Sequence, residues 1–123
     1  MAKKILIAED SSVIQNLTRR ILTIQQYEIT SVKNGAQVLD KLSKEKYDLV
    51  LLDIHMPVMD GMTCAREIRS TNPGDNRDIP IIAITGNAKN YSMDDFKEAG
   101  IDDYLPKPLN YDNMVEKVKS YIE

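Results

Sequence analysis

The chain has 123 residues, 42% of them hydrophobic and 28% charged, with a formal net charge of -3. This length predicts one domain spanning residues 1–123, and the slight excess of acids offers no basic surface for a phosphate backbone, so nucleic-acid binding is not expected. The one cysteine, Cys64, excludes an intramolecular disulfide, and no apolar run approaches the roughly 20 residues that cross a bilayer, so we expect a cytoplasmic protein without membrane contact.

Strand-like and helix-like patterns alternate along the chain. Short apolar runs predict strands at Lys4–Ala8, Glu28–Val32, Asp48–Leu52, Pro80–Ile84 and Asp103–Leu105. Apolar residues repeated three or four positions apart predict a helix after each strand. The expected buried stripes are Val13, Leu17, Ile21 and Ile24; Val38, Leu39 and Leu42; Met62, Ala65 and Ile68; Phe96; and Met114, Val115, Val118 and Ile122.

This alternation predicts an α/β fold in three layers. Five strands that alternate with five helices imply parallel strands joined by right-handed crossovers. A doubly wound five-stranded sheet in the order 2-1-3-4-5, with helices on both faces, would bury all the helix stripes. In that order strands 1 and 3 are neighbours, and ligands bind beyond the carboxyl ends of such strands.

Polar residues follow the strands at this edge of the predicted sheet. Glu9 and Asp10 follow the first strand, Asp53 the third, Thr85 ends the fourth and Lys107 comes after the fifth. Three carboxylates brought together repel unless a proton or a cation relieves them, and oxygen ligands suit Mg²⁺. A carboxylate can also attack phosphorus to form an aspartyl phosphate, with a lysine and a hydroxyl beside the phosphoryl oxygens. The pattern therefore indicates phosphoryl transfer assisted by Mg²⁺.

The chain resembles the receiver domains of two-component signalling over essentially its whole length. The resemblance lies in four segments, each at the end of a predicted strand: Ile5–Asp10 (ILIAED), Leu51–Gly61 (LLDIHMPVMDG), Ile81–Gly86 (IIAITG) and Tyr104–Pro108 (YLPKP). Receivers have the flavodoxin-like topology, and the resemblance therefore implies the same sheet order.

The resemblance implies a role for each matching residue. Asp53 matches the phosphoacceptor, and Glu9 and Asp10 match the acidic pair, with Asp10 as the direct ligand of Mg²⁺ and Glu9 holding metal-bound water. The backbone carbonyl of His55 would complete the metal shell. Lys107 matches the lysine that contacts the phosphoryl group, and Lys107–Pro108 is a cis bond in relatives.

Two further pairs of positions match residues that tune receivers. Thr85 and Tyr104 match the switch pair, in which the hydroxyl moves toward the phosphoryl group and the ring turns inward. This movement changes the surface of the fourth helix, fifth strand and fifth helix. His55 and Asn87 occupy the positions that tune the lifetime of the acyl phosphate.

The resemblance also implies the partners. The phosphoryl group would come from a phosphohistidine on a histidine kinase or a histidine phosphotransfer protein, and two copies of the chain could pair as a homodimer through the switching surface. The segments Ile81–Ala88 and Gly100–Leu109 are similar to receivers of hybrid sensor kinases. The transfer modifies the chain itself, so we do not expect a turnover enzyme.

The sequence leaves several alternative functions to be distinguished. A phosphatase of the haloacid dehalogenase type needs a second Asp at the position of His55, and a flavin carrier needs a phosphate loop where the chain has the acids Glu9 and Asp10. A degenerate receiver would only bind partners. The acids could merely cap helices, Thr85 and Lys107 could be ordinary surface or strand-end residues, and Tyr104 could serve packing alone. Phosphate release from small esters would favour the phosphatase, and a yellow protein the flavin carrier.

Overall fold

The structure is a computed structural model that describes residues 2–71, 76–86 and 91–123. Strands and helices alternate along these residues, as the apolar pattern predicts. The strands are β1 (Lys4–Ala8), β2 (Glu28–Val32), β3 (Leu49–Asp53), β4 (Ile81–Thr85) and β5 (Asp103–Pro106). The helices are α1 (Ser12–Ile24), α2 (Gly35–Lys44), α3 (Gly61–Thr71), α4 (Met93–Ala99) and α5 (Tyr111–Ile122).

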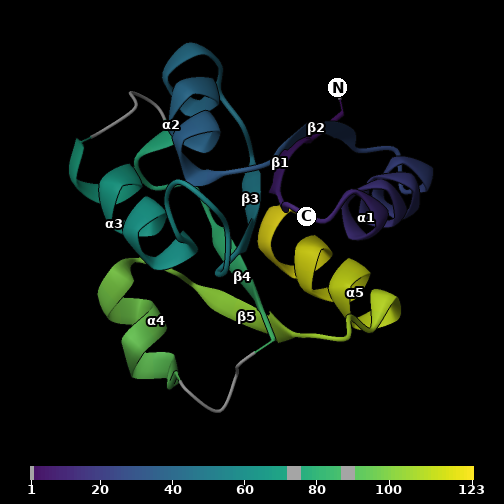
Figure 1. The fold of residues 1–123 in the computed structure, drawn as a ribbon. Coiled ribbons are helices and arrows are strands. Elements are labelled where there is room, and N and C mark those ends of the chain that lie inside the picture. Colours follow the sequence, from purple (N-terminus) through teal and green to yellow (C-terminus); the bar gives the residue numbers. More distant parts are fainter. Residues whose placement is uncertain (1, 72–75, 87–90) are drawn as a thin grey trace.

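The strands form one parallel sheet in the order β2-β1-β3-β4-β5, which confirms the predicted order. Helices α2, α3 and α4 cover one face of the sheet and α1 and α5 cover the other, so the molecule has three layers (Figure 1). Strands β1 and β3 lie side by side, with Ala8 opposite Leu52. Their carboxyl ends therefore meet at the switch point of the topology.

The central strands are buried on both faces. Every residue of β3 and β4 is buried, as a parallel strand between two helical layers requires. Side chains alternate between the layers: Leu51 packs with the α1 and α5 side, and Leu52 with the α2, α3 and α4 side. Asp53 is the last residue of β3 and is only 1% exposed, so its carboxylate lies where this apolar sheet ends.

The predicted buried face of α1 is wrong at three of its four residues, whereas the fourth, Ile21, packs against the core. Val13 is 77% exposed, Leu17 43% and Ile24 76%, although the helix itself spans Ser12–Ile24 as expected. The buried residues of α1 are Gln15, Thr18 and Leu22. Apolar spacing misleads here because the helix turns a glutamine inward, where its amide binds two backbone carbonyls and offsets the cost of burial.

Capping residues place the helices that flank the site. The hydroxyl of Ser11 accepts the N–H of Ile14 and begins α1 two residues after Glu9. Asn110 caps α5 by accepting the N–H of Asn113 at 3.0 Å. The peptide bond Lys107–Pro108 is cis, which agrees with the resemblance.

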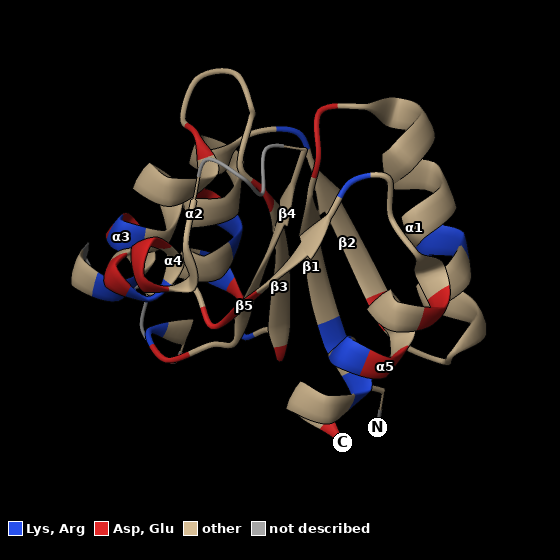
Figure 2. Ribbon diagram, turned by 90° about the horizontal axis from the view of Figure 1, so that it is seen from below, with Lys and Arg blue, Asp and Glu red and all other residues tan. Residues whose placement is uncertain are grey.

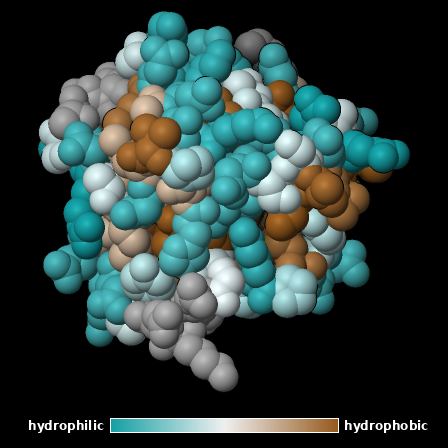
Figure 3. Space-filling view, in the orientation of Figure 1, coloured by the Kyte–Doolittle hydropathy of each residue, from teal (hydrophilic) through white to brown (hydrophobic). Residues whose placement is uncertain are grey.

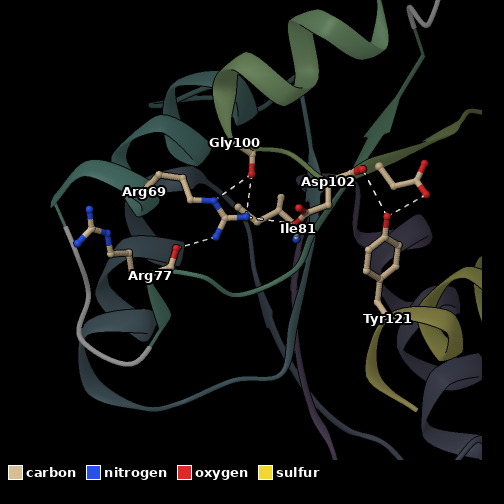
Figure 4. A network of polar contacts seen from close by, with 7 residues as sticks. Arg69, Arg77, Ile81, Gly100, Asp102 and Tyr121 are labelled. Carbon is tan, nitrogen blue, oxygen red and sulfur yellow. Dashed lines mark hydrogen bonds and ion pairs between the residues drawn. The ribbon is translucent and has the colours of Figure 1, made fainter.

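A polar network joins α3 to the segment between α4 and β5 (Figure 4). Arg69, in the last turn of α3, donates two hydrogen bonds to the carbonyl of Gly100, at 3.0 and 2.7 Å, and lies 3.2 Å from Oδ2 of Asp102. Tyr121 of α5 donates to the carbonyl of Asp102 from the other side. Gly100 has φ of +93° and ends α4, so this network holds the carboxyl end of that helix.

Charges of both signs are interspersed along the helices and loops of the described chain (Figure 2). Among the described residues, no helix combines the length and the apolar character needed to cross a membrane.

Candidate functional site

Three acids meet at the carboxyl ends of β1 and β3. One carboxylate oxygen from each of Glu9, Asp10 and Asp53 lies within 4.8 Å of the others. Glu9 and Asp53 are each 1% exposed, whereas Asp10 is exposed to solvent. The parallel pairing of β1 with β3 brings these groups together, although α1, β2 and α2 lie between the two strands in the sequence.

Lys107 reaches the same place from the loop after β5. Its N–H donates to the carbonyl of Thr85 at 2.8 Å, which aligns this loop with the end of β4. Its Nζ lies 3.2 Å from Oδ2 of Asp53 and 3.4 Å from Oε2 of Glu9. The other carboxylate oxygen of Asp53, Oδ1, accepts the N–H of His55 at 3.1 Å. The Asp53 carboxylate is thus held by a donor on each oxygen.

The negative charge of the three acids is only partly balanced by nearby positive groups. Burial and the nearby Asp53 charge raise the pKa of Glu9 to about 7, and the Ser11 N–H and the Lys107 ammonium offset this only in part. Burial lowers the pKa of Lys107, but the charges of Asp53 and Glu9 outweigh burial, and this pKa is raised on balance. One ammonium therefore pairs with two of the three clustered carboxyl groups, and the site favours a further cation.

The donor set fits a hard divalent ion. All three side chains offer carboxylate oxygens, the ligands that Mg²⁺ takes in proteins, and Mg²⁺ normally uses one or two carboxylates with waters and phosphate oxygens. Oε2 of Glu9 is buried without a hydrogen bond among the described residues, although it faces Lys107. An ion or its bound water would supply the partner that this oxygen lacks.

A family model described as the response regulator receiver domain matches residues 5–119. The chain belongs to this family. It is therefore a receiver domain of two-component signalling, and the other functions considered from the sequence do not account for a match of this extent.

Relatives of this receiver chain include parts of larger signalling proteins. It is 36% identical to the hybrid signal transduction histidine kinase I of Dictyostelium discoideum over 98% of the chain, and 31% identical to the response regulator MprA of Mycolicibacterium vanbaalenii over 99%. The chain spans only 8% of the length of the kinase and 51% of that of MprA.

Solved receiver structures have the same fold. The receiver domain of a sensor histidine kinase of Pseudomonas aeruginosa, solved with magnesium in its active-site cleft, is 33% identical with a TM-score of 0.88, over 99% of this chain and 98% of that one. The response regulator TrrA of Thermotoga maritima, in complex with Mg²⁺-BeF, is 36% identical with a TM-score of 0.84, over 97% and 98% of the two chains.

The remaining residues singled out from the receiver resemblance are Thr85, Tyr104, His55 and Asn87. Thr85 is fully buried at the end of β4. Tyr104 lies on β5 with a half-buried ring that stacks on Phe96 of α4, with ring centres 5.3 Å apart. His55 is exposed after β3, and Asn87 lies outside the described residues. The stacking of Tyr104 on Phe96 links β5 directly to α4.

Sequence reasoning missed one residue of this receiver site, Gln15. Its side-chain Nε2 donates to the carbonyl of Glu9 at 3.1 Å and to that of Val32 at 2.9 Å. The only available signal was a polar residue one turn into a helix that follows strand-end acids, and that signal does not say which face the helix buries.

Proposed function

We propose that this receiver accepts a phosphoryl group on Asp53 from a phosphohistidine of a histidine kinase or a histidine phosphotransfer protein. The observation that carries the proposal is the buried Asp53 carboxylate, within 4.8 Å of oxygens of Glu9 and Asp10 and 3.2 Å from the Lys107 ammonium. This arrangement combines a carboxylate nucleophile with the charge needed around phosphoryl oxygens.

In the transfer, a carboxylate oxygen of Asp53 forms a bond to phosphorus while the bond from phosphorus to the donor imidazole nitrogen breaks. The electron pair of the broken bond stays on the imidazole. The peptide N–H of His55, which donates to Oδ1 at 3.1 Å, orients the carboxylate for in-line attack. Lys107 leaves its ion pair with Asp53 as that charge is consumed and binds a phosphoryl oxygen instead.

Glu9, Asp10, Asp53 and the backbone carbonyl of His55 are the groups that would hold Mg²⁺. When bound, the ion supplies positive charge to the phosphoryl oxygens. Glu9 is buried and Asp10 is exposed, so Asp10 is the direct ligand in this proposal and Glu9 binds through metal-held water. The exposed Asp10 also leaves room for the waters that Mg²⁺ retains.

Phosphorylation would be read out through Thr85 and Tyr104. The phosphoryl group adds acceptor oxygens that draw in the Thr85 hydroxyl, and the Tyr104 ring follows into the space released. Because Tyr104 stacks on Phe96, a rotation of this ring changes a contact of α4 and thereby biases the α4-β5-α5 surface. To change the protein from mostly inactive to mostly active, phosphorylation must favour the active conformation over the inactive one by about 5.5 kcal/mol of free energy.

The phosphodonor surface is proposed to include the exposed apolar residues near the site. Val13 and Leu17 lie one helical turn apart on α1, which begins beside Asp10, and Val58 in the loop after β3 is 81% exposed. Hydrophobic surface is visible on the side of the molecule where α1 lies (Figure 3). Such residues suit the apolar face of a helical histidine-bearing partner.

The α4-β5-α5 surface is the proposed contact for downstream partners, a second copy of the chain among them. On this surface Asp103 of β5 pairs with Lys117 of α5 at 3.0 Å and accepts from the hydroxyl of Tyr121 at 3.2 Å. A homodimer formed only after phosphorylation would appear as a doubling of mass in sedimentation with a phosphoryl mimic, and unchanged mass would remove the second copy from the proposal.

The phosphoacceptor assignment is tested by intact mass after incubation with Mg²⁺ and a small phosphodonor such as acetyl phosphate. We expect one acid-stable, base-labile phosphoryl adduct on the wild type and none on Asp53→Asn. Asp60→Asn is the matched control, because Asp60 is exposed and its side chain accepts the N–H of Thr63 at 2.8 Å at the start of α3. Equal labelling of wild type and Asp53→Asn would defeat the assignment.

A further inference from the structure

Gln15 is a buried polar residue next to the acidic cluster that the transfer itself does not use. It is 9% exposed and lies on the inner face of α1 with Thr18 and Leu22. Its Nε2 donates two hydrogen bonds, to the carbonyls of Glu9 and Val32, and both are buried. Burying an amide in a helix face is unfavourable unless its hydrogen bonds are made, so these two bonds account for its position.

The two carbonyls lie at the ends of β1 and β2, where the ladder between these strands stops. Val32 is the last residue of β2, and its carbonyl also accepts the N–H of Glu9 at 3.1 Å. Gln15, which belongs to α1, therefore links the two strands through one more pair of hydrogen bonds just beyond the end of their ladder. The first residue beyond β1 is held on both sides of its backbone, by the Val32 carbonyl at its N–H and by Gln15 at its carbonyl.

The carbonyl of Glu9 belongs to the peptide unit that joins Glu9 to Asp10. Its direction sets the plane of that peptide, and hence the direction in which the exposed Asp10 side chain leaves the backbone. The Glu9 carboxylate is held separately, because its Oε1 accepts the N–H of Ser11 at 3.1 Å. Gln15 thus acts on the backbone between the two acids, while the Ser11 peptide acts on the side chain of the first.

We propose that Gln15 is a positioning residue for the metal site, holding the Glu9–Asp10 peptide in the orientation that directs Asp10 toward Asp53. The inference rests on the proposed function. Mg²⁺ demands near-octahedral geometry at short distances, so a small rotation of one ligand weakens its binding. Groups that orient ligands typically contribute ten- to a hundredfold to metal affinity.

The test compares Gln15→Met with Leu22→Ala. Methionine keeps the length and volume of the side chain but removes both donors, whereas Leu22 lies on the same buried face about 10 Å further along α1 and packs in the apolar core. Both changes lower the denaturation midpoint. The readouts are the dissociation constant for Mg²⁺, from NMR titration of backbone amides, and the ¹⁵N resonance of Asp10, whose nitrogen belongs to the peptide in question.

For Gln15→Met we expect the Mg²⁺ dissociation constant to rise about tenfold and the Asp10 resonance to shift before any metal is added. For Leu22→Ala we expect a constant within about twofold of the wild type. If Gln15→Met does not fold, Gln15→Asn replaces it; its amide is one methylene too short to reach both carbonyls, and the constant should still rise at least about threefold.

An unchanged Mg²⁺ dissociation constant in the folded Gln15 variant would overturn the proposal. An equal loss of Mg²⁺ affinity in Leu22→Ala would overturn it too, since either result assigns Gln15 a role in stability alone. Failure of the proposed function looks different. In that case the wild type itself shows no response of Asp10 or Asp53 to Mg²⁺.

Discussion

Nζ of Lys107 lies 3.2 Å from Oδ2 of Asp53, although 54 positions of sequence separate the two residues. The same ammonium lies 3.4 Å from Glu9, so one cation is shared between two buried carboxyl groups. A shared cation competes with a divalent ion for the same carboxylates and is available to a phosphoryl oxygen once the Asp53 charge is consumed. These two consequences can be separated by experiment.

Replacing Lys107 by methionine is expected to have opposite effects on metal binding and on phosphorylation. Loss of the ammonium removes a competing positive charge, so the affinity for Mg²⁺ should increase. The same loss removes a group that stabilises the phosphoryl oxygens, so labelling of Asp53 by a small phosphodonor should slow roughly tenfold or more. Metal titration and the time course of intact mass measure the two quantities.

Lys117→Met is the matched control for this experiment, because Lys117 is also a half-buried lysine in an ion pair, with Asp103 on the α5 side. It should change neither quantity. A Lys107→Met protein that loses Mg²⁺ affinity together with the labelling rate would indicate collapse of the site and would contradict the competition argument.

Glu9→Gln is expected to stabilise the metal-free protein at pH 8 but hardly at pH 5. The pKa of Glu9 is raised to about 7 by burial and by Asp53, so the folded state holds the proton more tightly than the unfolded chain. Stability is therefore lost as the pH rises from about 4.5 to about 7, and above that range the buried charge costs roughly 1 to 3 kcal/mol. Glutamine avoids this cost.

Urea denaturation of both proteins at the two pH values, without divalent ions, measures the effect. Added Mg²⁺ should reverse the order at pH 8, because only the wild type gains the full binding energy. A Glu9→Gln protein that is less stable than the wild type at pH 8 in the absence of metal would show that the contact with Lys107 outweighs burial.

Gly61→Ala is expected to destabilise the fold by about 1 to 3 kcal/mol and to weaken Mg²⁺ binding. A Cβ at this position would lie 2.6 Å from the carbonyl oxygen of Asp53 and 2.8 Å from Cα of Ile54, and backbone atoms cannot move aside without displacing the end of β3. Gly86→Ala is the control, since a Cβ there meets nothing within 4 Å. Similar losses in the two variants would point to glycine flexibility rather than close packing.

Val58→Asn is expected to raise stability by about 1 kcal/mol. Val58 has φ of +71°, and the N–H of Met59 donates to the carbonyl of Pro57 at 2.7 Å across it, which is a tight turn that a β-branched residue adopts only with strain. Asparagine tolerates positive φ better. Chemical denaturation gives the difference, and Val58→Ala, which removes the β-branch but has no polar side chain to hydrogen-bond locally at positive φ, should gain less.

The same variant tests the phosphodonor surface. If the exposed Val58 side chain contacts a histidine-bearing partner, Val58→Asn should slow transfer from that protein while leaving labelling by acetyl phosphate unchanged. If Val58→Asn accepts phosphoryl groups from the protein donor as fast as the wild type does, Val58 is removed from the proposed surface without affecting the assignment of Asp53.

The sequence by itself determined the order of the elements, the parallel sheet and the set of polar residues at its edge. Strands buried on both faces must be continuous apolar runs, as Leu49–Leu52 and Ile81–Ile84 are, and right-handed crossovers leave few ways to arrange five of them. Once β1 lies beside β3, the residues that follow these strands must meet, so the proximity of Asp10 and Asp53 follows from local pattern and handedness.

Only the tertiary structure decided which face of α1 is buried, what pKa the Glu9 carboxyl group has and which carboxylates pair with Lys107. Apolar periodicity cannot foresee that the backbone carbonyls of Glu9 and Val32 make a buried Gln15 favourable and leave Val13 in solvent. The pKa of Glu9 likewise depends on burial and on neighbours that come from other strands. Hydrogen-bond satisfaction and electrostatics are set by groups distant in sequence, and a reading of local spacing contains neither.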